Sequence, residues 1–274
     1  MHNNNIDNIT KILKNCRNLI ITAGAGMGVD SGLPDFRSNE GFWKSYPPYK
    51  KLNLSFYEAA NPATFIVNPE LAWGFYGHRL NLYRKTKPHK GFYYIKEWIN
   101  KLSLNFFIIT SNVDGQFQKG GFDEQHIFEI HGSIHYLQCL KPCLHEIWEN
   151  KMTFTVDESS MKSKVIPTCQ HCGHIARPNI LMFGDDSWIS NRSDIQYQNF
   201  SKWVKSISNK GNTIILEIGA GKAVPTIRHF ASHVANSTNG TIIRINPYDY
   251  TIEKPHISLP MKAVDALELI PHGL

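Results

Sequence analysis

Four of the five cysteines fall into two close pairs, a pattern that suits a zinc site. Two intervening residues are commoner than the three of the first pair, and the gap between the pairs is longer than the common spacing. Three residues separate Cys139 from Cys143, two separate Cys169 from Cys172, and 25 residues lie between the pairs. Two short turns with paired thiolates supply the four soft ligands of a tetrahedral zinc ion. Because four cysteines would fill every coordination position, we expect a structural rather than a catalytic metal.

Other residues leave alternatives open for this region. His145, His171 and His174 are replacement ligands if one cysteine does not bind, and four free thiols are the alternative to a metal. Cys16 stands apart in the expected first helix, and we interpret it as a small buried apolar residue.

Two apolar stretches each run into a glycine-rich turn, an arrangement that suits phosphate binding. Residues 19–23 precede the turn at 24–26, and residues 213–218 precede the turn at 219–221. Glycine lets a backbone approach a pyrophosphate, because no Cβ blocks the approach and N–H groups can point at the oxygens. The pattern predicts a dinucleotide site, although one glycine-rich turn by itself is a weak signal.

Strand and helix patterns alternate along most of the chain. This alternation favours an α/β fold, a Rossmann-like doubly wound parallel sheet with helices on both faces. Ligands of such sheets bind beyond the carboxyl ends of the strands, where both glycine turns fall. Strands are predicted at 19–23, 105–110, 127–130, 213–218 and 241–246, and helices at about 6–15, 68–84, 89–102, 194–209, 224–235 and 262–270.

Two regions interrupt the alternation, and we interpret them as a smaller inserted zinc-binding and helical module. Residues 42–88 are rich in aromatic residues and proline, and residues 136–176 carry the paired cysteines. We therefore expect one domain over residues 1–274. Its large Rossmann-like lobe comprises about 1–41, 89–135 and 177–274, and its small lobe comprises about 42–88 and 136–176, with the zinc module at 136–176.

The composition is that of a globular protein with a sizeable core, since 42 % of the 274 residues are hydrophobic and 19 % are charged. The net charge of +6 indicates a mildly basic surface, but no long Lys/Arg run indicates nucleic-acid binding. No stretch approaches the roughly 20 apolar residues of a membrane helix, and the polar start does not resemble a signal peptide. We expect a cytoplasmic protein in which disulfides are disfavoured.

Several short motifs follow one another in a specific order. They are the turn at 24–26, Ser31–Ser38, Ser111–Gly115, Ile130–Gly132, the two cysteine pairs, and Arg177-Pro178 followed by Phe183-Gly184. In this order the chain resembles the sirtuin family of NAD-dependent protein deacylases, over about residues 19 to 267. The resemblance implies NAD as co-substrate, one structural zinc and an acyl-lysine protein or peptide as partner. It also implies release of nicotinamide as the acyl group passes to ADP-ribose.

The resemblance makes His131 the general base. In sirtuins the matching histidine acts on a ribose hydroxyl of NAD, and an imidazole suits this task because its pKa lies near working pH. Asn112 and Asp114 match residues that hold the nicotinamide carboxamide and the nicotinamide ribose or a water there, roles that amide and carboxylate groups can fill. An ordinary turn is the alternative for these two residues.

The resemblance also implies a set of cofactor-binding residues. Phe36 would shield the nicotinamide side from water, and Arg37 would donate toward phosphate or ribose. On the adenosine side the turn at 219–221 lacks the usual hydroxyls, so its backbone N–H groups must act instead, and Ala263 would pack near adenine. The implied set is Gly24, Ala25, Gly26, Asp35, Phe36, Arg37, Ser111, Asn112, Asp114, Gly219, Ala220, Gly221, Asn246 and Ala263.

Tyr76 and Arg79 could recognise the acyl group. On a helix, residues three apart share a face, so the phenol and the guanidinium can converge on one carboxylate. The pair resembles that of the succinyl- and malonyl-removing sirtuins, which implies a preference for acidic acyl groups. The alternative is an aromatic core stripe with a surface arginine.

Three positions depart from the family pattern. Ser111 replaces a glutamine that contacts ribose, Phe117 stands where a histidine is usual, and Gly28 replaces a common serine. The change at Ser111 keeps open ADP-ribosyl transfer or plain NAD hydrolysis in the same pocket. A non-catalytic NAD or ADP-ribose sensor is a third alternative, which His131 disfavours. Hydride transfer is disfavoured because no clear acidic residue follows the glycines at the spacing of Rossmann dehydrogenases.

Overall fold

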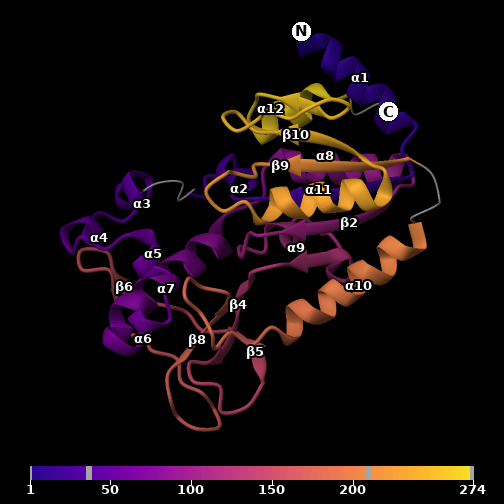
Figure 1. Cartoon of the computed structure of the whole chain (residues 1–274). Coiled ribbons are helices and arrows are strands. Elements are labelled where there is room, and N and C mark those ends of the chain that lie inside the picture. Colours follow the sequence, from indigo (N-terminus) through magenta and orange to yellow (C-terminus); the bar gives the residue numbers. More distant parts are fainter. Residues whose placement is uncertain (1, 35–38, 208–211, 272–274) are drawn as a thin grey trace.

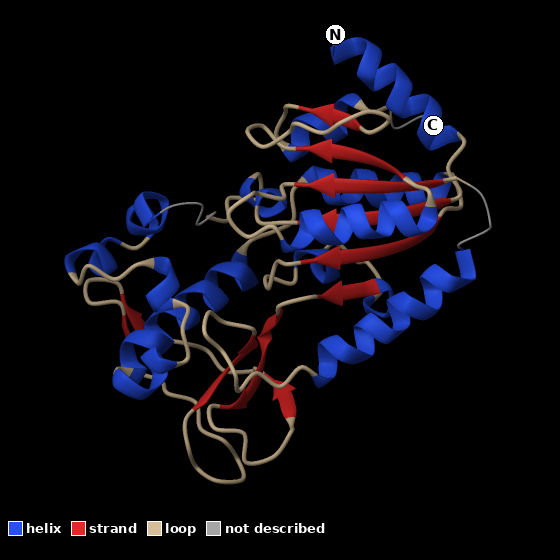
Figure 2. Cartoon of the chain, in the orientation of Figure 1, coloured by secondary structure: helices blue, strands red, loops and turns tan. Residues whose placement is uncertain are grey.

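Six strands, all parallel to their neighbours, form the central sheet of the protein (Figures 1 and 2). The structure is a computed structural model, and it describes residues 2–34, 39–207 and 212–271. The strand order is β11-β10-β9-β1-β2-β3. The chain builds outward from β1 to β3 and then crosses to β9 on the other side of β1, so the switch point lies between β1 and β9. The strands are β1 (Asn18–Ala23), β2 (Asn105–Thr110), β3 (Ile127–Glu129), β9 (Thr213–Ile218), β10 (Thr241–Ile245) and β11 (Ile257–Leu259).

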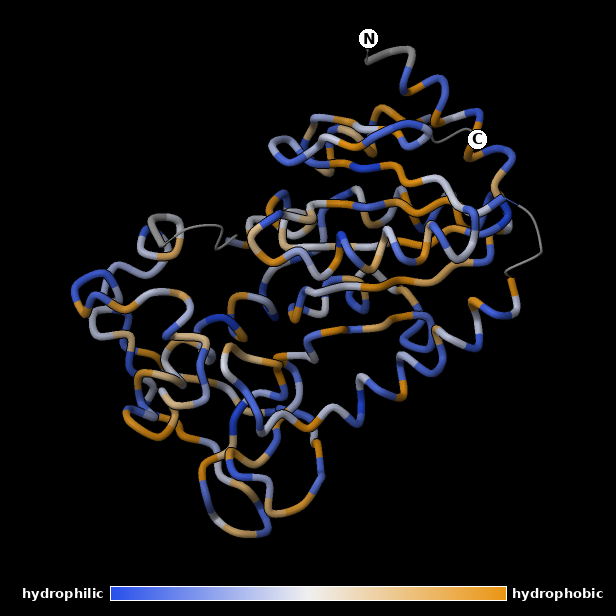
Figure 3. The backbone as a smooth tube through the Cα atoms, in the orientation of Figure 1, coloured by the Kyte–Doolittle hydropathy of each residue, from blue (hydrophilic) through white to orange (hydrophobic). Residues whose placement is uncertain are grey.

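The central strands are apolar on both faces because helices cover both. Every residue of β1 and β9 is buried, and Figure 3 shows hydrophobic residues along the strands. A parallel sheet covered on both sides is expected to carry such near-continuous apolar runs rather than an alternating pattern. On one face lie α1 (His2–Lys14), α8 (Lys90–Lys101) and α12 (Ala263–Leu269), and on the other lie α10 (Asn191–Ile207) and α11 (Thr226–Thr238).

A second core lies beside the sheet and is rich in aromatic residues. It is built around α7 (Pro69–Lys85), together with four short helices and two small antiparallel sheets. The short helices are α3 (Asn39–Ser45), α4 (Pro47–Lys51), α5 (Phe56–Ala59) and α6 (Ala63–Val67). One small sheet has the order β5-β4-β8 and consists of β4 (Gly132–Cys139), β5 (Ile147–Glu149) and β8 (Ala176–Ile180). The other pairs β6 (Val156–Asp157) with β7 (Lys162–Ser163). Short elements elsewhere are α2 (Gly26–Val29), α9 (Gln116–Lys119) and η1 (Glu124–His126).

Helix α7 joins the two segments that interrupt the alternation in the sequence. The Trp73 ring stacks on Phe154 at 4.8 Å between centroids, and its indole N–H donates to the Ala176 carbonyl at 2.9 Å. Gly74 lies against the Met161 backbone so closely that an added Cβ would be 1.8 Å from the carbonyl oxygen. Regions far apart in the sequence thus share one core through this helix.

The predicted α/β fold with a parallel sheet and a smaller module is confirmed. The five predicted strands match β1, β2, β3, β9 and β10 within one residue at each end, and each predicted helix is present with shifted ends. The sixth strand, β11, was not predicted, because three residues are too few for a periodic pattern. The short helices α3 to α6 and the strands β4, β5 and β8 were also missed. No helix in the described residues is long and apolar enough to cross a membrane.

Gly74→Ala tests the packing of α7. Alanine normally favours a helix over glycine, but here its methyl group would meet backbone atoms of Met161 that cannot move independently. We expect a loss of about 1–3 kcal/mol in the free energy of unfolding, measured in urea. Gly221→Ala is the control, because the nearest atom to its added Cβ would be a side-chain oxygen of Asp249 at 3.9 Å, an ordinary contact. Equal stability of Gly74→Ala and the wild type would contradict this packing.

Candidate active site

A cavity of about 360 Å³ lies beyond the carboxyl ends of β1, β2 and β9. Its volume is within the range of small-molecule sites. The turns that follow these strands form one wall, and side chains from α7 and from the segment after β8 form others. Of the predicted site residues, the lining includes Gly24, Ala25, Tyr76, Arg79, Ser111, Asn112, Asp114, His131, Gly219, Ala220 and Gly221.

The two glycine turns touch each other at the switch point of the sheet. A Cβ added to Gly24 would lie 2.8 Å from the Gly219 oxygen, and one added to Gly26 would lie 2.6 Å from the Gly219 Cα. Gly219 itself has a φ of +64°, a conformation that favours glycine. The glycines therefore allow the turns to approach each other, in addition to any approach to a ligand.

His131 lies between β3 and β4, and the backbone directs its ring to the cavity. Gly132 follows it with a φ of +74°, and an added Cβ there would lie 2.2 Å from the Asn179 oxygen. A side chain at position 132 would therefore displace the strand that pairs with β4. Burial lowers the pKa of the His131 imidazole, while a hydrogen bond to the Ser111 backbone acts in the opposite direction. The ring is neutral at neutral pH and can accept a proton.

Asn112 and Asp114 follow β2 in the same wall of the cavity. The Asn112 side-chain N–H donates to the Gly24 carbonyl at 2.9 Å and so links two turns of the wall. Asp114 is 7 % exposed, and its Oδ1 accepts from the Gln116 backbone N–H at 2.9 Å. Burial raises the pKa of this carboxyl to about 6, against the lowering effect of that hydrogen bond. Such a shift is frequent at functional sites.

At the α7 side of the cavity, the guanidinium of Arg79 is packed among aromatic rings. It lies 5.0 Å from the Phe75 ring centroid, 5.7 Å from that of Tyr76 and 5.4 Å from that of Tyr83. Only 8 % of the Arg79 surface is exposed. The alternative of a surface arginine is therefore wrong, although Phe75 and Tyr76 do belong to the aromatic core.

Some predicted site residues do not line this cavity. Gly26 packs against Gly219, and Ala263 is buried in the core where α12 begins. Asn246 is fully buried, donating to the Ala220 carbonyl at 2.8 Å and accepting from the backbone N–H groups of residues 248 and 249. Its side chain supports the turn at 219–221 through the Ala220 carbonyl. Asp35, Phe36 and Arg37 lie outside the described residues.

The structure adds Tyr83 to the lining, which the sequence analysis missed. Its spacing could have revealed it, since it lies four residues after Arg79 and seven after Tyr76 on one helix face.

The structure also explains one departure from the family pattern. Phe117 is 2 % exposed and packs edge-on against Phe92 and Phe122, so this position serves the core.

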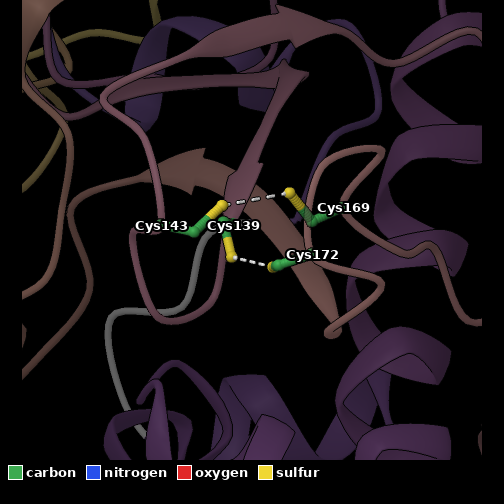
Figure 4. A group of neighbouring side chains, drawn as sticks. All are labelled: Cys139, Cys143, Cys169 and Cys172. Atoms are coloured by element: carbon green, nitrogen blue, oxygen red, sulfur yellow. Dashed lines mark hydrogen bonds between the residues drawn. The ribbon is translucent and has the colours of Figure 1, made fainter.

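The four paired cysteines form one cluster at the far end of β4 (Figure 4). Their sulfur atoms all lie within 4.8 Å of one another. The Cys139 and Cys172 sulfurs are 3.6 Å apart, as are those of Cys143 and Cys169. Four thiols converging from two turns fit a tetrahedral zinc ion, and with four protein ligands the site is structural.

Comparison with known proteins places this geometry in one family. Residues 24–210 match the Sir2 family. An NAD-dependent protein deacylase of Pyrococcus abyssi is 27 % identical over 238 residues, which are 87 % of this chain and 85 % of that protein. A protein of the same name from Leptospira interrogans is 28 % identical over 239 residues, again 87 % and 85 % of the two chains.

Solved structures of this family have the same fold. A mutant Sir2 homologue in complex with ADP-ribose superposes with a TM-score of 0.71 at 25 % identity, covering 96 % of this chain and 94 % of that one. A Sir2 homologue in complex with NAD gives a TM-score of 0.70 at 25 % identity, covering 96 % and 92 %.

The cysteine cluster predicts about one zinc ion per chain. Cys169→Ser should lower the zinc content of the purified protein and its melting temperature, because serine is a poor replacement for a thiolate ligand. Cys16→Ser is the control, since Cys16 lies in the large lobe and donates to the Asn18 carbonyl. Elemental analysis measures the metal. Less than about half an equivalent in freshly purified wild-type protein would contradict the site.

Proposed function

Because the chain belongs to the Sir2 family, we propose that it is an NAD-dependent protein-lysine deacylase. The reaction transfers the acyl group of a modified lysine to ADP-ribose, with release of nicotinamide. The observation that carries the proposal is the position of His131 in one cavity with both glycine turns, Asn112 and Asp114. The names of the related proteins support the same activity.

In this proposal His131 is the general base. When bound, NAD would supply the ribose carbon that the acyl oxygen of the modified lysine attacks, and the nicotinamide that leaves from that carbon. The neutral His131 imidazole accepts the proton of a ribose hydroxyl, which then takes over the acyl group. Ser111, which stands where the family usually has a glutamine, lines the same cavity as His131.

The remaining cavity residues bind and exclude water. Asn112 and Asp114 hold the nicotinamide and its ribose, and the backbone at 219–221 faces the adenosine half. Val113 and Phe183 are apolar lining residues that keep water from the reacting carbon. Asn246 acts by holding the turn at 219–221 through the Ala220 carbonyl.

His131→Ala tests the proposed base. We expect nicotinamide release in the presence of NAD and an acyl peptide to fall by about 10²- to 10⁴-fold. His233→Ala on the exposed surface of α11 is the control and should keep wild-type activity. Mass spectrometry of the products identifies the acyl transfer.

The same assay separates the alternative functions. Release that depends on the acyl peptide supports the deacylase. Release without peptide would indicate NAD hydrolysis or ADP-ribosyl transfer, and no release by the wild type would indicate a sensor.

We further propose that acidic acyl groups are better substrates than acetyl groups. The buried guanidinium of Arg79 lines the cavity beside the Tyr76 phenol. A cation enclosed by aromatic rings has little water to stabilise it, so a substrate carboxylate would be a favourable partner. Succinyl- and malonyl-lysine carry such a group at the end of a short chain.

Arg79→Met tests this preference. We expect kcat/KM on a succinyl peptide to fall by about tenfold or more, because one hydrogen bond to a charged group is lost. The value of kcat/KM on a matched acetyl peptide should change little. Arg84→Met is the control on the same helix, because Arg84 donates to the Met152 and Asn150 carbonyls outside the cavity. An equal loss on both peptides would remove the proposed preference.

A further inference from the structure

We propose that Tyr83 determines acyl specificity by donating its phenolic O–H to an acceptor at the distal end of the acyl group. This inference rests on the deacylase function proposed above and adds a residue outside the Tyr76 and Arg79 pair. The ligand class is an acyl chain that ends in a carboxylate.

The hydrogen bonds of Arg79 fix the role of the Tyr83 oxygen. Nε of Arg79 donates to this oxygen at 3.0 Å, and Nη2 donates to it at 2.7 Å. A phenol oxygen has two lone pairs, so these bonds occupy its accepting capacity. What Tyr83 can still offer is its own proton.

That proton has no acceptor in the part of the chain that the structure describes. The hydrogen bonds of the Tyr83 hydroxyl are the two from Arg79. The Asp114 carboxylate acts on the phenol through space, and no hydrogen bond joins these two side chains. Only 5 % of the Tyr83 surface is exposed, so bulk water has little access to the hydroxyl. A buried donor without a partner is costly and calls for a ligand.

The surroundings keep the proton on Tyr83 and make it a strong donor. Burial raises the pKa of the phenol, against the lowering effect of Arg79, so the hydroxyl stays protonated at neutral pH. Two N–H bonds from a cation withdraw electron density from the oxygen, and chained hydrogen bonds strengthen one another. Because Tyr83, Arg79 and Tyr76 all line the cavity, an anion there can meet the phenol and the guanidinium together.

The test compares the binding of two peptides that differ in one group. A succinyl-lysine and a butyryl-lysine peptide have acyl chains of equal length, ending in a carboxylate and in a methyl group. Calorimetry gives Kd for each peptide with the wild type, Tyr83→Phe and Tyr49→Phe. Tyr49 is a matched control, because its buried hydroxyl donates to the Leu71 carbonyl in the same aromatic core, away from the cavity lining.

We expect Tyr83→Phe to weaken binding of the succinyl peptide by about tenfold or more, the scale of a hydrogen bond to a charged group. Binding of the butyryl peptide should stay within about threefold, and Tyr49→Phe should leave the ratio of the two Kd values unchanged. Equal weakening of both peptides, no weakening, or no binding of either peptide by the wild type would overturn the inference.

Two further measurements keep the result unambiguous. Tyr83→Phe removes one hydrogen-bond acceptor of the buried Arg79, so melting temperatures are compared first. If the variant does not fold, Tyr83→Met replaces it, since the flexible methionine side chain fills irregular gaps. Deacylation is assayed separately. Selective loss of succinyl-peptide binding without any deacylation by the wild type would support the role of Tyr83 while overturning the proposed function.

Discussion

The close approach of two backbone turns is the constraint on which the site depends. Gly24 and Gly219 directly follow the adjacent strands β1 and β9, and their backbones lie so close together that neither residue has space for a Cβ. This contact lies at the switch point of the sheet, where the connections leave toward opposite edges and open a crevice. Two side-chain amides stabilise the two turns: Asn112 donates to the Gly24 carbonyl, and Asn246 donates to the Ala220 carbonyl. The wall of the cavity is thus a continuous backbone surface held by side-chain amides.

Helix α7 connects the second core to this wall. One part of the helix is held by close packing, with Trp73 stacked on Phe154 and Gly74 against the Met161 backbone. Another part presents Tyr76, Arg79 and Tyr83 to the cavity. The zinc cluster lies at the end of β4 away from His131, so the metal can stabilise the small module without touching the reaction. Strand β4 thus separates His131, which directly precedes it, from the cysteine cluster at its other end.

Burial has opposite effects on the two titratable residues of the wall. It lowers the pKa of His131 and raises the pKa of Asp114 to about 6, because in each case it disfavours the charged form. At neutral pH the imidazole is therefore a free base, and the carboxyl is mostly ionised but easily protonated. A histidine that is neutral and lines a cavity is suited to accept a proton from a bound hydroxyl.

The sequence by itself determined the sheet strands, the long helices and the paired cysteines, because apolar runs, helical periodicity and ligand spacing are local patterns. It also predicted the segments that carry the cavity lining, through the order of short motifs. Only the tertiary structure decided which side chains meet. Gly24 meets the backbone of Gly219, and Asn246 donates to the Ala220 carbonyl, because contacts between distant segments depend on how these segments pack. The strands β4, β5, β8 and β11 had weak local signals because pairing with neighbours, rather than periodicity, defines strands this short or irregular.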